Sequence, residues 1–384
     1  MTSVEVKHMK EKLWLVMIVI VFVLAGCTNT PQSDAESKKM TLHSPSSMEK
    51  SQIHYATIST ATLSAIGDVL IHDTVYNDAK TDQGYNFTPI FQGVKSHLEQ
   101  ADITVANSES IIGGTEIGVS SYPTFNSPTE VGDAMKKVGV DVVSMANNHT
   151  LDQGIIGIQN AIEHWDRLGV AYAGAALSED EAKNICTVTK HDITFSFLSF
   201  TYGTNGIPTP TGQDFLVNRI DRDKITSDIS RAKKISDVVV LSLHFGNEYE
   251  RMPSAEQREL AHFAAEQGAD IILGHHPHVL QPPEWVQTSD NRQAFVAYSL
   301  GNFLSGQENL YRRIGGIMNI KVEKQTTALG SSISIAKPSF VPTYVTSERA
   351  GNYAIKPLKE INDTYYQHIK QHMRTWIPDL SFAY

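Results

Sequence analysis

The sequence predicts a layered α/β fold in which helices flank mixed sheets. Two observations favour this fold class. Short apolar runs of strand length alternate with helix-like segments, and these runs are apolar throughout. Continuous apolar residues are typical of strands that helices cover on both faces. Several runs also end in polar residues that can bind metal or transfer protons, and α/β folds place active sites at the carboxyl ends of strands.

Six apolar runs are the expected core strands, and each ends next to residues that could carry chemistry. The runs with their following residues are Leu63–Gly67 with Asp68, Ile103–Ala106 with Asn107-Ser108-Glu109, Val140–Ala146 with Asn147-Asn148-His149, Val238–Leu243 with His244, Ile271–Leu273 with Gly274-His275-His276-Pro277-His278, and Phe295–Leu300 with Gly301-Asn302-Phe303. Further strands are expected at residues 193–200 and 332–335, and a helix at residues 361–376.

Boundary signals define two of the intervening helices. Ser127-Pro128-Thr129-Glu130 predicts a capping box with proline at the first helical position, and Gly139 suits the helix end. Residues 254–257 begin another helix. The Gly-, Pro- and Thr-rich segment 202–212 is a surface connection by default and a candidate wall of the substrate site.

The amino-terminal segment has the pattern of an export signal. Lys7, Lys10 and Lys12 precede an apolar run at residues 13–24, which is shorter than the roughly 20 residues that a membrane-spanning helix needs. Residues Leu24-Ala25-Gly26-Cys27 resemble a bacterial lipobox, which implies cleavage before Cys27 and lipid attachment to its sulfur. An uncleaved signal anchor is the alternative.

The expected organisation follows from this export signal. Residues 27–60 are rich in Ser, Thr, Lys and Gln, which is typical of a flexible tether. The expected parts are a lipoprotein signal peptide (1–26), a tether with lipidated Cys27 (27–60), a folded domain (61–340) and a C-terminal extension that packs on it (341–384). The protein is then expected on the extracytoplasmic face of the cell membrane, anchored by lipid.

Composition limits the partners and the redox chemistry. The formal net charge is −10, and no basic stripe is visible, which argues against a nucleic-acid partner. Cys186 is the only cysteine besides Cys27, so a mature form with lipidated Cys27 would have no intrachain disulfide. We interpret Cys186 as a small core residue.

The polar residues at the strand ends form a candidate metal site. Singly, each has an ordinary explanation: Asp68 could cap a turn, and Glu109 could be a solvated loop carboxylate. Together they form a mixed oxygen and nitrogen set, which suits Mn, Fe or Zn better than thiolate chemistry or calcium alone. Two such ions about 3.5 to 4 Å apart would clamp the oxygens of an in-line displacement.

Several motifs resemble those of the CapA/PgsA family of capsule and poly-γ-glutamate synthesis proteins. The similarity extends over about Thr62–Gly316 and implies a metallophosphatase-like α/β sandwich, because that family resembles calcineurin-like metallophosphatases in fold. The motifs, in order, are Gly67-Asp68, Asn107-Ser108-Glu109, Met145-Ala146-Asn147-Asn148-His149-Thr150-Leu151-Asp152-Gln153-Gly154, His244-Phe245-Gly246-Asn247-Glu248-Tyr249, Gly274-His275-His276-Pro277-His278-Val279-Leu280-Gln281-Pro282 and Tyr298-Ser299-Leu300-Gly301-Asn302-Phe303.

The resemblance also implies roles for individual residues. One metal would be held by Asp68, Glu109 and His278, with Glu109 bridging, and the other by Asn148, His244 and His276. His149 would protonate the leaving oxygen, and Asp152 would orient it. The phosphatase pattern has a histidine two residues after its first aspartate, where this chain has Leu70, and an aspartate where this chain has Glu109.

Two functions are compatible with these motifs. The first is a membrane-tethered hydrolase that acts on a phosphate ester or on a link in an envelope polymer. The second is a scaffold or polymer-binding subunit of a capsule synthesis and export complex. Arg312 and Arg313 could supply positive charge to an anionic substrate or remain solvated surface residues, and Asn302 is a further candidate for substrate binding.

Overall fold

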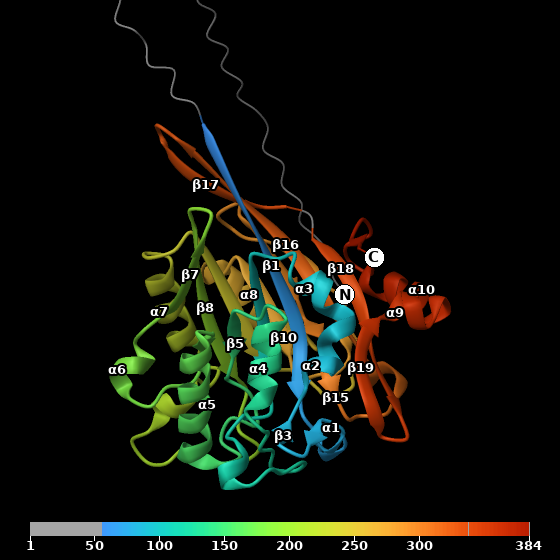
Figure 1. The fold of residues 1–384 in the computed structure, drawn as a ribbon. Coiled ribbons are helices and arrows are strands. Elements are labelled where there is room, and N and C mark those ends of the chain that lie inside the picture. The colour runs from blue at the N-terminus through green and yellow to red at the C-terminus, as the bar shows by residue number, and fades with distance from the viewer. Residues whose placement is uncertain (1–55, 337, 384) are drawn as a thin grey trace, which may run out of the picture. The chain divides into compact units, whose positions relative to one another are not determined.

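The computed structural model describes residues 56–336 and 338–383. Within them, two mixed sheets pack face to face and helices cover their outer faces (Figure 1). The prediction of an α/β fold with helices flanking mixed sheets is confirmed. The expected signal peptide and Cys27 lie outside the described residues. Within the described ranges, no helix combines the length and hydropathy needed to cross a membrane.

The first sheet contains ten strands and is mixed. One half of it consists of parallel strands, and candidate site residues lie at or just after the carboxyl ends of several of them. In spatial order, its main path is β19 (Gly351–Pro357), β18 (Ser339–Glu348), β16 (Ile314–Thr327), β1 (Thr57–Leu70), β4 (Ile103–Ser108), β5 (Val142–Ser144) and β6 (Ala171–Ala173). Three strands pair beside this path: β15 (Asn302–Ser305), β17 (Gly330–Ile335) and β20 (Ser381–Phe382). The strands β1 and β18 cross the domain boundaries expected after residues 60 and 340.

The second sheet is also mixed, with a parallel centre and antiparallel edges. Its strands in order are β12 (Glu284–Gln287), β13 (Gln293–Ala297), β10 (Ile271–His275), β9 (Val238–His244), β8 (Ile193–Thr201) and β7 (Cys186–Lys190). Two strand pairs lie outside both sheets: β11 (Leu280–Gln281) with β14 (Ser299–Leu300), and β2 (Lys80–Thr81) with β3 (Gly84–Tyr85).

Helices form the two outer layers. The first sheet is covered by α2 (Thr88–Phe91), α4 (Glu130–Lys137) and α5 (Gly154–Leu168), and the second by α7 (Arg222–Ala232) and α8 (Ala255–Gln267). The short helices are α1 (Asp73–Asp78), η1 (Gln92–Val94), α3 (Lys95–Leu98), η2 (Thr115–Ile117), α6 (Glu179–Ala182), η3 (Asp214–Leu216), η4 (Leu310–Arg313) and α9 (Leu358–Ile361). The last helix, α10 (Asp363–Met373), contributes Ile369 to the core between the sheets.

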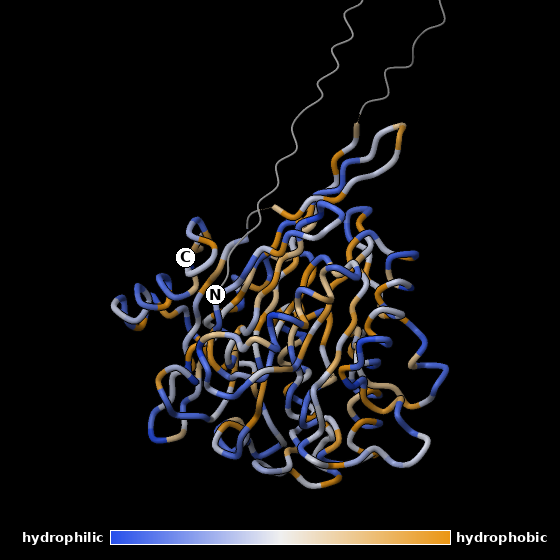
Figure 2. The backbone as a smooth tube through the Cα atoms, turned by 180° about the vertical axis from the view of Figure 1, so that it is seen from behind, coloured by the Kyte–Doolittle hydropathy of each residue, from blue (hydrophilic) through white to orange (hydrophobic). Residues whose placement is uncertain are grey.

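Side-chain alternation along the strands explains the layers. In β9, Val238 and Val240 face the core between the sheets, whereas Val239 and Leu241 pack against α7 and α8. Because successive side chains of a strand point to opposite faces, a run that is apolar throughout must be covered on both sides. Figure 2 shows the resulting hydrophobic stretches along the central strands.

The helix boundary signals were right at one position and wrong at another. The helix expected to begin at residues 254–257 is present: Ser254 forms a capping box with Gln257, and α8 begins at the next residue. The box predicted at residues 127–130 is wrong, because α4 begins only at Glu130 and no side chain caps it. Ser127 is instead bound to the loop after β4: its hydroxyl donates to Ser110 at 2.9 Å, and its amide donates to the carbonyl of Ile111.

The segment 298–302 leads from β13 of the second sheet to β15 of the first sheet, next to the candidate site. The segment 298–302 passes so close to both sheets that a Cβ atom on Gly67 would overlap the carbonyl oxygen of Gly301. A Cβ atom on Gly274 would likewise overlap the carbonyl oxygen of Tyr298. Glycine at these two positions therefore permits β1 and β10 to lie close to the segment 298–302. Each glycine directly precedes a polar residue at the end of its strand.

We expect Gly274→Ala to destabilise the protein, because the added methyl group must displace backbone atoms. Overpacking of this kind typically costs about 1 to 3 kcal/mol. The free energy of unfolding from urea titration measures the loss. Gly203→Ala is the control, since its Cβ would meet nothing within 4 Å, and surface substitutions usually stay within about 0.5 kcal/mol. Equal stability of the two variants would contradict the close approach of the segment 298–302 to β10.

Candidate metal centre

All six expected ligands meet near the carboxyl ends of strands from the two sheets. Each is at most 5% exposed, so the group lies inside the protein although most of its members are ionisable or strongly polar. The six residues are Asp68, Glu109, Asn148, His244, His276 and His278. Buried groups of this kind are rarely left without a partner, and their convergence therefore indicates a site that binds a ligand.

Strand register brings these residues together. Asp68 of β1 lies opposite Asn107 of β4, and Glu109 follows that strand directly. In the second sheet, His244 at the end of β9 lies opposite His275 at the end of β10. The backbone then turns sharply, with φ values of 97° at His276 and 58° at His278. These positive φ values are uncommon for non-glycine residues and let two nearby imidazoles face the same cluster.

The first donor group consists of Asp68, Glu109 and His278, whose ligand atoms lie within 4.8 Å of one another. His278 Nδ1 lies 3.2 Å from Asp68 Oδ2 and 3.1 Å from Asn302 Oδ1. Both neighbours are acceptors, so Nδ1 is the nitrogen that donates, and Nε2 is the nitrogen that faces the rest of the cluster. That Nε2 atom lies 3.7 Å from Glu109 Oε1.

The second donor group consists of Glu109, His244 and His276, again within 4.8 Å. His244 Nε2 lies 3.5 Å from Glu109 Oε1 and 2.9 Å from Asn148 Oδ1. The amide oxygen of Asn148 therefore joins the same group. Glu109 belongs to both groups, which is the arrangement expected for a bridging carboxylate between two ions.

The surroundings of Glu109 fit a metal ion. Among the described residues, neither of its carboxylate oxygens has a hydrogen-bond partner, although both are buried. The imidazole nitrogens at 3.5 and 3.7 Å are beyond normal hydrogen-bond length. Two ligands that each lie about 2.1 Å from one ion are about 3 to 3.5 Å apart, so these separations are close to those of ligands that share an ion.

Protonation in the cluster also favours metal binding. Burial raises the pKa of Glu109 well above its ordinary value, and the charge of Asp68 adds to this. Burial opposes ionisation of Asp68 too, but the imidazoles of His275 and His278 hold its pKa well below the ordinary value. Burial lowers the pKa of His276 to about 4, with a contribution from His278, and lowers that of His244 strongly. His244 and His276 are therefore neutral at pH 7, which is the form that binds metal.

His149 and Asp152 form a separate pair next to the cluster. His149 Nδ1 lies 2.7 Å from Asp152 Oδ2, and the same oxygen accepts a hydrogen bond from the amide of Phe125 at 2.6 Å. The Phe125 ring packs edge-on against His149, with centroids 4.7 Å apart. The carboxylate thereby holds a proton on Nδ1 and fixes the orientation of the ring.

The structure separates the three residues predicted to bind substrate. Asn302 contacts His278 and also donates to the backbone carbonyl of Arg312 at 2.9 Å. The guanidinium of Arg312 lies 3.4 Å from the centre of the Tyr249 ring. Arg313 instead donates to the hydroxyl of Ser347 on β18. Arg312 therefore belongs to the rim of the site, and Arg313 is bound to the sheet.

Three polar residues near the cluster were not predicted as site residues. Asn107 donates to Asp68 at 2.9 Å, and Asn205 accepts from Asn148 at 3.2 Å. Glu248 forms a third donor group with His276 and His278. Asn107 and Glu248 lie in the motifs that carry Glu109 and His244, which was the available signal. Asn205 lies in the loop 202–212, which was expected as a candidate wall of the substrate site, although no local pattern singled out this residue.

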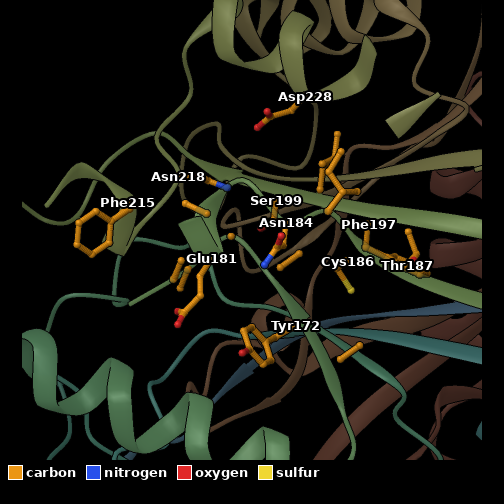
Figure 3. A pocket seen from close by; sticks show the side chains of 18 of the residues that line it. Tyr172, Glu181, Asn184, Cys186, Thr187, Phe197, Ser199, Phe215, Asn218 and Asp228 are labelled. Carbon is orange, nitrogen blue, oxygen red and sulfur yellow. The ribbon is translucent and has the colours of Figure 1, made fainter. Parts of the chain in front are cut away.

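A separate cavity of about 320 Å³ lies between β6, β7 and β8 (Figure 3). Of its charged lining residues, Asp228 is paired with Lys224 at 2.7 Å and with Arg231, which also lines the cavity, at 3.0 Å. Cys186 also lines it, and burial raises the pKa of this thiol to about 12. The thiol is therefore protonated at neutral pH and is a poor nucleophile, in keeping with a structural role.

Comparison with solved structures gives a weak likeness. A 5'-nucleotidase precursor from Thermus thermophilus aligns with a TM-score of 0.44 and 12% sequence identity. The alignment covers 82% of this chain and 60% of that chain, so this protein spans less than two thirds of its length. A TM-score of this size supports neither a shared fold nor a shared activity.

Sequence comparisons identify the family. PGA biosynthesis protein CapA of Bacillus subtilis (strain 168) is 29% identical over 274 residues, which cover 69% of this chain and 68% of that relative. Capsule biosynthesis protein CapA of Bacillus anthracis is 27% identical over 309 residues, which cover 77% and 72%. Residues 62–307, well over half of the chain, match the bacterial capsule synthesis protein family PGA_cap. The chain belongs to this family of CapA-like capsule synthesis proteins.

Proposed function

We propose that this protein is a metal-dependent, phosphoesterase-like hydrolase that is tethered to the extracytoplasmic face of the cell membrane and acts in capsule synthesis. One observation carries the metal-dependent part: the buried carboxylate of Glu109 has no hydrogen-bond partner among the described residues, and it lies near His244 and His278. A cation would offset the cost of burying this carboxylate. Membership of the capsule synthesis family supports the context.

The donor set suits two divalent ions, chosen from Mn, Fe and Zn. Glu109 would bridge them, because it belongs to both donor groups. The remaining ligands would be Asp68 and His278 for one ion, and Asn148, His244 and His276 for the other. When bound, divalent metal supplies Lewis acidity toward a phosphoryl oxygen.

The protein's own residues would complete the reaction. Asp152 holds a proton on Nδ1 of His149, which leaves Nε2 as the nitrogen that exchanges a proton with the leaving oxygen. Arg312, fixed over Tyr249 at the rim, would attract an anionic substrate. The capsule polymer or its synthesis complex is the expected partner, and the scaffold function is the alternative if the site binds metal without turnover.

We expect divalent metal to stabilise the wild-type protein through this cluster. A ligand that binds only the folded state adds about 2.7 kcal/mol of stability at a concentration of 100 Kd. Thermal unfolding of chelator-treated protein, with and without Mn²⁺ or Zn²⁺, measures the shift. The double variant His276→Ala/His278→Ala should lose it, whereas His368→Ala, an exposed position on α10, should keep it. A wild-type melting temperature that neither metal changes would contradict the metal site.

We expect His149→Gln to reduce turnover by a factor of about 10² to 10⁴, the usual contribution of a general acid. Its metal content should remain that of the wild type, because His149 belongs to neither donor group. Hydrolysis of a panel of phosphomonoesters and phosphodiesters measures the loss. His72→Gln is a matched control, since His72 also packs edge-on against Phe125. If metal-loaded wild type hydrolyses nothing in the panel, the scaffold function is supported instead.

The lipid anchor is proposed from the export signal alone, because Cys27 lies outside the described residues. We expect Cys27→Ala to block processing or to release the protein from the membrane fraction. Cell fractionation with immunodetection measures this, and Cys186→Ala serves as the control because it removes the other cysteine. Normal processing together with unchanged membrane retention of Cys27→Ala would contradict a lipid anchor.

A further inference from the structure

Glu248 brings a third carboxylate to the cluster. It follows β9 by four residues and is exposed, unlike the six buried residues. One of its carboxylate oxygens lies within 4.8 Å of ligand nitrogens of both His276 and His278. These two histidines belong to different donor groups, so Glu248 approaches the cluster at the point where the two groups adjoin.

Backbone hydrogen bonds on both sides of Glu248 fix its loop beside the histidines. The amide of Phe245 donates to the carbonyl of His275 at 3.1 Å, and the amide of Tyr249 donates to the carbonyl of Pro277 at 2.8 Å. Gly246 adopts a φ of 98°, a backbone conformation that residues other than glycine rarely adopt. The loop 245–249 is therefore bound to the loop that carries His276 and His278.

The neighbouring side chains also support this position. Tyr249 follows Glu248 directly in the chain. Arg312 covers the Tyr249 ring at 3.4 Å, and Asn302 connects the Arg312 backbone to His278. Glu248 is thus part of a built rim rather than an isolated surface acid.

Donor and charge counts leave room for another ligand. The group of Asp68, Glu109 and His278 offers three protein donors, fewer than the four or more that these divalent metals take. Two divalent ions carry four positive charges, and the buried cluster supplies only the two carboxylates Asp68 and Glu109. A third carboxylate would reduce this excess of positive charge.

We propose that Glu248 is a further metal ligand, which approaches the cluster from the solvent side and binds metal together with His276 and His278. This inference rests on the proposed metal-dependent function. Because Glu248 is exposed and the other donors are buried, it would be the protein ligand nearest to an incoming substrate.

Binding of Mn²⁺ to the purified full-length chain tests this inference directly. Electron paramagnetic resonance of the free ion gives the affinity and the number of bound ions without any activity measurement. We expect Glu248→Gln to weaken the binding of at least one ion by about tenfold or more, in the range known for perturbed metal sites. Glu250→Gln removes the same charge from the same loop, outside all three donor groups, and should stay within about twofold of wild type.

The possible outcomes separate the two proposals. If Glu248→Gln and Glu250→Gln both bind Mn²⁺ like the wild type, Glu248 is not a ligand and the metal site itself stands. If both variants weaken binding equally, the carboxylates act only through their charge, and ligation by Glu248 is again wrong. If the wild type binds no Mn²⁺ while properly folded, the proposed metal-dependent function fails together with this inference.

Discussion

The rest of the site depends on two carboxylates buried beside one another. Asp68 and Glu109 are both inaccessible to solvent, and Glu109 lacks a hydrogen-bond partner within the described structure. Removing an ionised carboxylate from water costs several kcal/mol, and the neighbouring negative charge adds to that cost. A protonated Glu109 avoids the cost in the absence of metal, whereas a bound cation would replace that proton. His244 and His276 have lowered pKa values and are therefore already in the neutral form that binds metal.

The fold brings these groups together by joining the ends of two sheets. The donors come from both sheets, so neither sheet could form the cluster alone. Gly67 and Gly274 permit the segment 298–302 to pass close to β1 and β10, and this segment ends at Asn302, which contacts His278. The stability of the fold and the geometry of the candidate ligands are therefore coupled, because a shift of either strand would move these side chains as well as the backbone.

Much of the fold and most of the cluster could be predicted, because continuous apolar runs mark buried strands and parallel strands end at one edge. Other features could not. The 127–130 signal failed because Ser127 is bound to Ser110, a tertiary contact that local sequence does not reveal. Arg312 and Arg313 are adjacent in sequence, but in the tight helix η4 neighbouring side chains point in different directions. Glu248 and Asn205 reach the site through loops, where no periodicity indicates direction.

The central claim is that the buried cluster holds two divalent ions bridged by Glu109. Anomalous scattering from crystals grown with Mn²⁺ tests it most directly. The account predicts two peaks about 3.5 to 4 Å apart, one beside Asp68 and His278 and the other beside His244 and His276, with Glu109 between them. Fully occupied peaks elsewhere on the protein, with none inside this cluster, would contradict it.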